Sequence, residues 1–253
     1  MRIVSRFLFV SLLLYIAVCG WLFTFQRSLI YFPQARDIDK ANSTLRLPVP
    51  SAELVVTVRG HVGTKALIYF GGNAEDVSAN LSSFSNAFPD HALYLLHYRG
   101  YGGSSGSASE EALHADALAL FDMVHREYPD VSAIGRSLGT GVAIRLASQR
   151  PVSRLVLVTP YDSIQEIAAT QFPYIPIRWL LTDKFESWRD APKIRIPTLL
   201  IGAEFDEIIP RANTERLNAM FAKGVSSLVF IPAVGHNTIS NTAQYFDVMR
   251  AAL

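Results

Sequence analysis

The sequence has little cysteine and little charge. Cys19 is the single cysteine among 253 residues, which excludes an intramolecular disulfide and a multi-cysteine metal site. Charged residues make up 18% of the chain, against about 25% in average soluble proteins. The 23 basic residues almost balance the 22 acidic ones, for a net charge of +1. Such a chain has no basic field to attract nucleic acid, so we expect no nucleic-acid partner.

Motifs for metals and nucleotide cofactors are also missing. The chain has no His-Glu-x-x-His, no cluster of cysteine and histidine, and no Gly-x-x-x-x-Gly-Lys-Ser/Thr loop. We therefore expect neither a metal nor an organic cofactor. The hydrophobic content of 50% excludes an intrinsically disordered chain, which combines low hydrophobicity with high net charge.

Part of this apolar excess is concentrated near the N-terminus. Residues 7–25 carry no charge, and 16 of these 19 positions are hydrophobic. A helix of that length spans about 28 Å, close to the ~30 Å hydrocarbon core of a membrane. We predict a transmembrane anchor at 7–25 after a tail at 1–6, rather than a buried core helix, because no polar face breaks the run.

A cleaved signal peptide is the main alternative to an anchor, and it would give a secreted protein. Its small-residue site would be Ala17-Val18-Cys19, and a lipid-modified Cys19 is a further alternative. The apolar run continues through Trp21 past this site, which favours an uncleaved anchor. The short N-terminal tail favours an inside N-terminus, with the domain on the outer or periplasmic side. The flanking basic residues lie on both sides of the run: Arg2 and Arg6 before it, Arg27, Arg36 and Lys40 after it.

The rest of the chain alternates between two kinds of pattern. Residues 26–50 hold three prolines and are interpreted as a connector that packs on the edge of one domain at 51–253. Short apolar runs alternating with helical stretches predict an α/β fold with a mostly parallel, doubly wound sheet. Residues 161–192 interrupt the alternation and are predicted to form a short lid. The predicted strands are 54–58, 66–70, 92–96, 131–134, 155–158, 198–201 and 228–231, and the predicted helices are 75–88, 109–127, 138–149, 211–222 and 241–252.

The clearest chemical motif is Gly135-Arg136-Ser137-Leu138-Gly139, which matches Gly-x-Ser-x-Gly. An apolar strand is predicted before it and a helix after it, the setting of a nucleophilic serine on a sharp strand-to-helix turn. Such a turn crowds the positions two before and two after the serine, and glycine at both relieves the clash. The alternative is a chance match in a glycine-containing loop, and the flanking elements favour the nucleophile.

A serine hydroxyl is a weak nucleophile unless a neighbouring base takes its proton. His236 is the favoured base, because it lies in a loop between the last predicted strand and the last predicted helix. Loops at the carboxyl ends of the strands of an open α/β sheet surround the usual ligand site. The other five histidines are interpreted as surface or structural residues: His61, His91, His97, His114 and His125.

An acid is needed to orient the histidine and to stabilise its charged form. Asp206, just past an apolar strand, is favoured because Ser137, Asp206 and His236 then follow the chain order serine, acid, histidine. The rival acids are Glu204, Glu207 and Asp162.

Acyl transfer also requires donors for a developing oxyanion. The backbone N–H of Leu138, directly after the serine, is one expected donor. The other is expected from the loop at residues 70–74, where Gly72 lets the backbone approach a substrate closely. An ordinary strand-to-helix turn is the alternative interpretation of this loop.

Several further short motifs follow one another along the chain. They are Tyr31-Phe32-Pro33, Gly72-Asn73-Ala74, Tyr98-Arg99-Gly100-Tyr101-Gly102, Asp183-x-Phe185-x-Ser187 and Gly235-His236-Asn237. Together with the serine motif and the Asp206 segment, they resemble the α/β-hydrolase superfamily. The similarity is to its small membrane-anchored branch of Bem46-like proteins and depalmitoylating thioesterases, over about residues 28–250. The resemblance implies an α/β-hydrolase fold, a Ser137–Asp206–His236 triad, and an oxyanion hole from the N–H groups of Asn73 and Leu138.

Two positions depart from the pattern of that family. Gly71 stands where relatives usually have histidine, and His97 stands where they usually have aspartate. Neither is a triad member, so the departures bear on loop packing and substrate preference.

The motifs together predict a serine hydrolase that cleaves carboxylic esters or thioesters through an acyl-enzyme. The apolar lid and the anchor indicate a small-molecule or lipid-borne acyl substrate. A peptidase or amide hydrolase of the same fold is the first alternative. A catalytically inert scaffold tethered to the membrane is the second.

Overall fold

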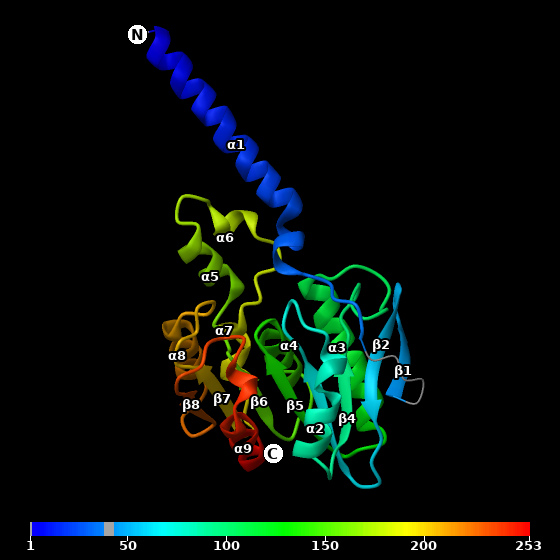
Figure 1. The fold of residues 1–253 in the computed structure, drawn as a ribbon. Helices are drawn as coiled ribbons and strands as arrows, with labels where there is room; N and C mark the ends of the chain where they lie inside the picture. Colours follow the sequence, from blue (N-terminus) through cyan, green and yellow to red (C-terminus); the bar gives the residue numbers. More distant parts are fainter. Residues whose placement is uncertain (1, 38–42) are drawn as a thin grey trace.

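The computed structural model describes residues 2–37 and 43–253 (Figure 1). Its strands are β1 (Thr44–Val49), β2 (Ala52–Arg59), β3 (Lys65–Phe70), β4 (Ala92–Leu96), β5 (Asp130–Arg136), β6 (Leu155–Val158), β7 (Thr198–Ala203) and β8 (Ser226–Ile231). Its α-helices are α1 (Arg2–Ile30), α2 (Leu81–Ala87), α3 (Glu110–His125), α4 (Leu138–Ala147), α5 (Ile164–Gln171), α6 (Ile177–Leu180), α7 (Ser187–Asp190), α8 (Arg211–Met220) and α9 (Ala243–Ala252). Short 3-10 helices are η2 (Val77–Asn80), η3 (Ala191–Lys193) and η4 (Ile239–Asn241).

The strands form one sheet in the order β1-β2-β4-β3-β5-β6-β7-β8. The pairs from β4 to β8 are parallel, whereas β2 runs antiparallel to β4 and β1 antiparallel to β2. The expected α/β fold with a mostly parallel, doubly wound sheet is confirmed.

Each central strand contributes to two cores, which explains its continuous apolar sequence. In β3, Ala66, Ile68 and Phe70 pack on the side of α3, α4 and α8. The intervening Leu67 and Tyr69 pack on the side of α2 and α9. Alternate residues of a strand point to opposite faces, so a sheet covered by helices on both faces needs apolar residues at every position.

Strand β1 corrects the interpretation of residues 26–50 as a connector. Residues 44–49 pair in register with β2 across a tight turn, and Pro48 lies within the strand. Proline is tolerated there because β1 is an edge strand, where an N–H need not be donated to a neighbour. The prolines and the short length of the run hid this strand. Residues 38–42 of the predicted connector, including Lys40, lie outside the described residues.

Helix α1 is longer than the apolar run that predicted it. It begins at Arg2 and ends at Ile30, so most of the predicted tail and the first connector residues are helical. Figure 1 shows α1 projecting away from the body of the protein. The helix is long and apolar enough to cross a membrane, and its most apolar stretch is not buried within the molecule. A membrane anchor and a signal sequence both have these properties.

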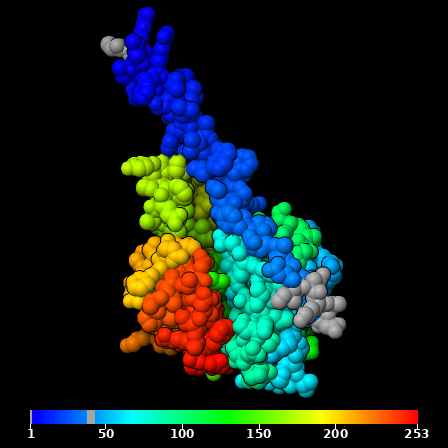
Figure 2. All heavy atoms as spheres, in the orientation of Figure 1, coloured from blue at the N-terminus to red at the C-terminus, as the bar shows by residue number. Residues whose placement is uncertain are grey.

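The interruption at 161–192 contains the short helices α5, α6 and α7. In Figure 1, α5 and α6 stand above the body, beside the C-terminal part of α1. The space-filling view in Figure 2 shows the same segment in contact with the end of α1. The lid and the N-terminal helix therefore rise from the same end of the molecule.

Candidate active site

Ser137 lies on a sharp turn between β5 and α4. Its backbone has φ 50° and ψ −118°, a left-handed conformation that costs free energy in a residue with a Cβ atom. The Ser137 N–H donates to the Val158 carbonyl at 2.9 Å, which ties the turn to β6. The strained turn directs the half-buried side chain away from the sheet, so the hydroxyl is accessible.

The two glycines of the motif are required by packing. A Cβ atom on Gly135 would overlap the carbonyl of Gly139, and a Cβ on Gly139 would overlap the carbonyl of Phe70. Both obstacles are backbone atoms, which cannot rotate away as a side chain can. The spacing of the motif therefore reflects the close approach of β3, β5 and α4 around Ser137.

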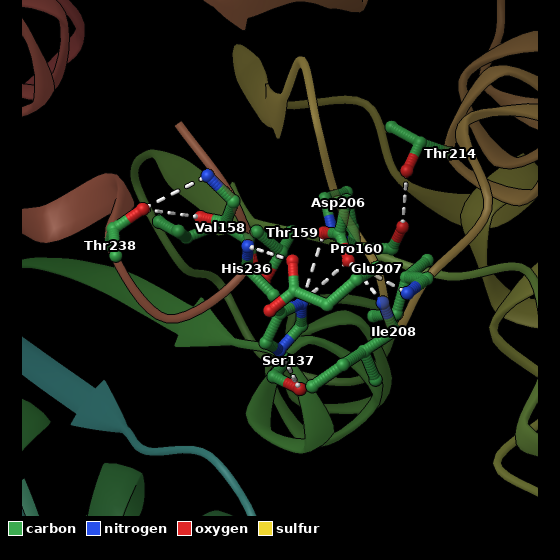
Figure 3. A network of polar contacts seen from close by, with 12 residues as sticks. Ser137, Val158, Thr159, Pro160, Asp206, Glu207, Ile208, Thr214, His236 and Thr238 are labelled. Carbon is green, nitrogen blue, oxygen red and sulfur yellow. Dashed lines mark hydrogen bonds and ion pairs between the residues drawn. The ribbon is translucent and has the colours of Figure 1, made fainter. Parts of the chain in front are cut away.

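His236 and Asp206 reach Ser137 from the loops after β8 and β7 (Figure 3). His236 Nε2 lies 3.0 Å from Ser137 Oγ. On the other side of the ring, Nδ1 lies 2.9 Å and 3.0 Å from the two carboxylate oxygens of Asp206. Both side chains are almost fully buried, with 4% and 6% of their surface exposed. The three side chains form one continuous line of hydrogen-bonding distances. In the sequence, however, Asp206 lies 30 positions before His236 and Ser137 lies 99 positions before it.

The rival acids lie elsewhere. Glu204 accepts from the Ala233 N–H and Glu207 from the backbone N–H of His236, so both brace the loop that carries the histidine. Asp162 pairs with Arg216 and Asn213 of α8. The position of Asp206 is set by the N–H groups of Ile208 and Ile209, which donate to its Oδ1.

Two backbone N–H groups beside Ser137 are unpaired. Those of Leu138 and Asn73 have no acceptor among the residues that the structure describes. The Gly72 N–H, in contrast, donates to Glu75 Oε2 at 2.7 Å. Gly72 lies against Ser137 and lines the cavity in front of it, but its N–H is already used. Of the sequence-derived candidates, Leu138 and Asn73 retain a free donor and Gly72 does not.

Glu75 belongs to the site, although no sequence motif predicted it. Besides Gly72, its carboxylate accepts from Tyr69 and Asn80 and pairs with Arg136 at 3.3 Å. Burial by itself lowers the pKa of Arg136, but the carboxylate of Glu75 raises it above its ordinary value. The buried pair joins the loop after β3 to the residue before Ser137. Its sequence signal was its position directly after Gly72-Asn73-Ala74.

A cavity of about 570 Å³ opens in front of Ser137 and His236. Most of its lining residues are aliphatic, and the lid contributes the largest group of them, joined by Ile208 and Ile209 from the loop after β7. Helix α1 also contributes to the wall, through Leu22, Gln26, Leu29 and Ile30, which no sequence pattern predicted. Periodicity in an apolar run cannot show this, because every face of such a helix looks alike.

The other histidines stay outside the site. His97 is buried beside Thr57, with 2.9 Å between Nε2 and the threonine hydroxyl, and burial lowers its pKa to about 4. His114 packs on Phe185, and burial lowers its pKa to about 4 as well. Gly102 accommodates His97, because a Cβ at that glycine would overlap the ring. Both histidines are neutral near pH 7, as expected for structural residues.

The sheet, the strained serine turn and the loops that converge on it define the α/β-hydrolase class. Solved structures share this fold: the enol-lactonase of Burkholderia xenovorans LB400 matches with a TM-score of 0.63, over 81% of this chain and 98% of its own, at 14% identity. A scan of protein-family models finds no match to this chain.

Relatives by sequence agree with the fold. An uncharacterised protein of Mycobacterium tuberculosis is 35% identical over 87% of this chain and 83% of its own length. An alpha/beta hydrolase domain-containing protein of Caenorhabditis elegans is 30% identical over 73% of this chain and 56% of its own. The Schizosaccharomyces pombe protein bem46 is 28% identical over 94% of this chain and 89% of its own length. The chain belongs to the α/β-hydrolase superfamily.

Proposed function

We propose that this chain is a serine hydrolase that cleaves carboxylic esters or thioesters of apolar acyl groups. The observation that carries the proposal is the line from Ser137 Oγ through His236 to Asp206, with 3.0 Å and 2.9 Å between successive polar atoms. This arrangement has the geometry that activates a serine. Hydrolase chemistry in general is supported by the family, and the specific roles below are our assignment.

In the first half-reaction, Ser137 Oγ attacks the acyl carbon while His236 Nε2 takes the hydroxyl proton. The carbonyl oxygen becomes an oxyanion, which the N–H groups of Leu138 and Asn73 are placed to stabilise. Asp206 holds the ring in the tautomer with a proton on Nδ1 and stabilises the imidazolium. The intermediate collapses when the bond to the leaving alcohol or thiol breaks, and His236 donates the proton to that group.

In the second half-reaction, a water takes the place of the leaving group. His236 Nε2 accepts a proton from this water, whose oxygen attacks the acyl carbon of the Ser137 ester. The second tetrahedral intermediate releases the carboxylic acid, and the proton returns to Ser137 Oγ. The enzyme is regenerated, and the net reaction adds one water across the ester or thioester bond.

The lining of the cavity supports an acyl group as the part of the substrate that is held there. Its charged side chains, Glu75 and Arg136, are paired with each other. The remaining walls are mostly aliphatic, which favours a hydrocarbon chain over a charged peptide. The substrate class is therefore a small-molecule or lipid-borne acyl ester or thioester.

Labelling with a fluorophosphonate tests the role of Ser137. Wild type is expected to form a covalent adduct, and Ser137→Ala is expected to lose it. Ser82→Ala, on the exposed surface of α2, is the matched control and keeps the label. Equal labelling of wild type and Ser137→Ala would overturn the assignment.

A substrate panel separates the alternatives. We expect a burst of p-nitrophenol from p-nitrophenyl esters, and slower turnover of aminoacyl amides with the same acyl group. Faster turnover of the amides would identify a peptidase or amide hydrolase instead. A purified, folded protein that gives no product from either series would be a scaffold.

We also propose that α1 stays attached to the domain as a single-pass membrane anchor. Tyr15 Oη donates to the carbonyl of Tyr174 in the lid, so residues on the N-terminal side of the Cys19 position contact the domain. Gln26 and Arg27 make further contacts with the segment around Asp183. Gln26 and Arg27 lie after the cleavage position and would keep their contacts in either case. A signal peptide that is removed has no need of the Tyr15 contact, which supports retention of the helix.

A further inference from the structure

The last turns of α1 form one wall of the cavity in front of Ser137. Leu22, Gln26, Leu29 and Ile30 all line it. Their spacing of four, three and one positions places them on a single helix face. The lid contributes another wall, which includes Ile164, Ile167, Ile175, Ile177 and Leu180.

This wall is held in place by a polar latch at Gln26. The amide oxygen accepts from the N–H of Thr182 at 2.7 Å and from its hydroxyl at 2.9 Å. The amide nitrogen donates to the Leu180 carbonyl at 3.2 Å. Gln26 is 9% exposed, so these bonds form largely out of water. A buried amide with partners on both atoms fixes the helix against the lid.

A second latch is formed by the next residue, Arg27, together with Tyr31, which directly follows the helix. Arg27 pairs with Asp183 at 3.1 Å, and the Tyr31 hydroxyl donates to the same carboxylate at 3.0 Å. Burial, and next the charge of Asp183, raise the pKa of Tyr31, which therefore keeps the proton that it donates. The helix end is thus tied to the lid by Gln26 and Arg27 within α1 and by Tyr31 just after it.

The helix end is also joined to the loop that carries a free N–H for the oxyanion. Asn73 Nδ2 donates to the Ile30 carbonyl at 3.0 Å, and the Phe32 N–H donates to the Asn73 carbonyl at 3.0 Å. The position of Asn73 therefore depends on where α1 ends. This makes the N-terminal helix a structural part of the site.

We call the part of the cavity between the α1 wall and the lid wall the slot. It leads from Ser137 toward the apolar part of the helix, as far as Leu22. Tyr15 contacts the lid at Tyr174, and Gln26 contacts it at Thr182. The helical rise puts these contacts about 16 Å apart, roughly half of a ~30 Å hydrocarbon core. At the lid tip, Tyr174 and Trp179 are 87% and 89% exposed. Large aromatic side chains that are exposed to solvent next to a helix of membrane-spanning length are typical of a surface that contacts lipid.

Building on the proposed ester or thioester hydrolysis, we propose that the acyl chain lies between α1 and the lid and enters sideways from the adjacent membrane leaflet. Leu22 and Leu29 are then specificity-determining residues for chain length, located in the membrane helix itself. The carbonyl to be attacked sits at Ser137, and the tail of the chain extends past Leu29 toward Leu22.

Substitutions in the wall test the proposal in the full-length protein, reconstituted in phosphatidylcholine nanodiscs. Leu29→Trp and Leu22→Trp fill the slot. We expect each to lower the ratio of kcat/KM for p-nitrophenyl laurate to that for p-nitrophenyl butyrate by about tenfold, the effect of excluding a few methylenes. Leu14→Trp is the matched control: the same change on the same helix, at an exposed leucine outside the cavity. It is expected to keep the wild-type ratio.

Cross-linking provides a readout that needs no turnover. A diazirine-bearing fatty acid, added to the Ser137→Ala variant, is expected to label residues 22–30, and excess laurate is expected to compete that label away. Labelling of residues 7–18 by bulk lipid should resist the competition. The proposal is overturned if butyrate is hydrolysed but both tryptophan variants keep the wild-type ratio, or if laurate fails to compete at residues 22–30. Competed labelling without any hydrolysis would support the acyl slot and refute the proposed function.

Discussion

At the scale of single residues, the site depends on groups that do no chemistry themselves. Glu75 accepts from the Gly72 N–H at 2.7 Å and pairs with Arg136 at 3.3 Å. It thereby holds the loop of Asn73 against the turn of Ser137. Oxyanion donors act only when they are placed correctly before the reaction starts. Glu75 is in this sense a positioning residue.

Removing the carboxylate of Glu75 is expected to lower the rate of the chemical step. In Glu75→Ala, Gly72 loses its acceptor and Arg136 is left as a buried unpaired charge. We expect kcat for p-nitrophenyl butyrate to fall by about one to two orders of magnitude, in the range of a displaced oxyanion donor, with a smaller change in KM. Glu75→Gln keeps an oxygen for Gly72 and should recover part of kcat. Steady-state kinetics that show wild-type kcat in Glu75→Ala would contradict this role.

His97 is expected to make stability depend on pH. Burial lowers its pKa to about 4 in the folded protein, compared with about 6.5 in an unfolded chain. Between these values the unfolded state binds the proton and the folded state does not. Stability is therefore complete above the unfolded pKa and falls as pH drops from 6.5 toward 4, by at most about 3 kcal/mol from this group.

Urea unfolding of wild type and His97→Asn across this pH range measures the effect. The variant is expected to lose less free energy of unfolding between neutral pH and pH 4 than wild type does, whatever its stability at neutral pH. The same acid-induced loss in both proteins would show that His97 does not carry the dependence.

Single residues were predictable where local chemistry left a pattern in the chain. The spacing of Gly135, Ser137 and Gly139 reflects close backbone contacts around one strand-to-helix turn, which require glycine at two fixed positions and so leave a motif in the sequence. Glu75 has no motif of its own beyond its position after Gly72-Asn73-Ala74, because its partners Tyr69 and Arg136 come from two different strands. The free or paired state of the Gly72 N–H also depended on a side chain that no motif names.

At the scale of elements, the two ends of the apolar segment have different surroundings. Its N-terminal half makes few contacts with the rest of the protein, whereas its C-terminal end contacts the lid and the loop of Asn73. An apolar run of 19 residues indicates a helix of spanning length, but it does not indicate which residues face a partner. Strand β1 was missed for a related reason, since its pairing with β2 is a contact between segments.

The latch at Gln26 is expected to control the mobility of the lid. Gln26→Leu leaves the Thr182 N–H and hydroxyl without their acceptor, at a local cost of about 1–3 kcal/mol. Hydrogen exchange of residues 177–183 should become faster than in wild type. Thr24→Leu is the control, because Thr24 bonds only to the carbonyl of Gly20 within its own helix. Unchanged exchange in Gln26→Leu would mean that other contacts hold the lid.

At the scale of the whole molecule, three features lie at one end: the apolar helix α1, the lid with its exposed Tyr174 and Trp179, and the cavity that both elements line. Figure 1 shows α1, α5 and α6 on the same side of the sheet, and Figure 2 shows their surfaces in contact. In the proposed arrangement this end faces the membrane and the sheet lies outside it. The near-zero net charge fits attachment by hydrocarbon burial instead of by a basic surface.

The proposed anchor has consequences that fractionation can check. The protein is expected to stay in the membrane pellet after an alkaline carbonate wash, and its intact mass should include residues 2–19. A C-terminal alkaline phosphatase fusion is expected to be active, as an outer or periplasmic domain requires. A soluble protein that begins after Cys19 would identify a cleaved signal peptide, and an inactive fusion would reverse the topology.

The sequence by itself determined the α/β class, the apolar N-terminal helix, and Ser137 and His236 as the candidate nucleophile and base, and it favoured Asp206 as the acid. Each of these leaves a local trace: alternating apolar runs, an uncharged stretch, and a glycine-flanked serine followed in order by an acid and a histidine. The tertiary structure alone decided which acid faces His236, which backbone N–H groups are free, and that α1 forms a wall of the cavity. These outcomes depend on contacts between segments far apart in the chain, and such contacts are made by the folded geometry and not by any local run of residues.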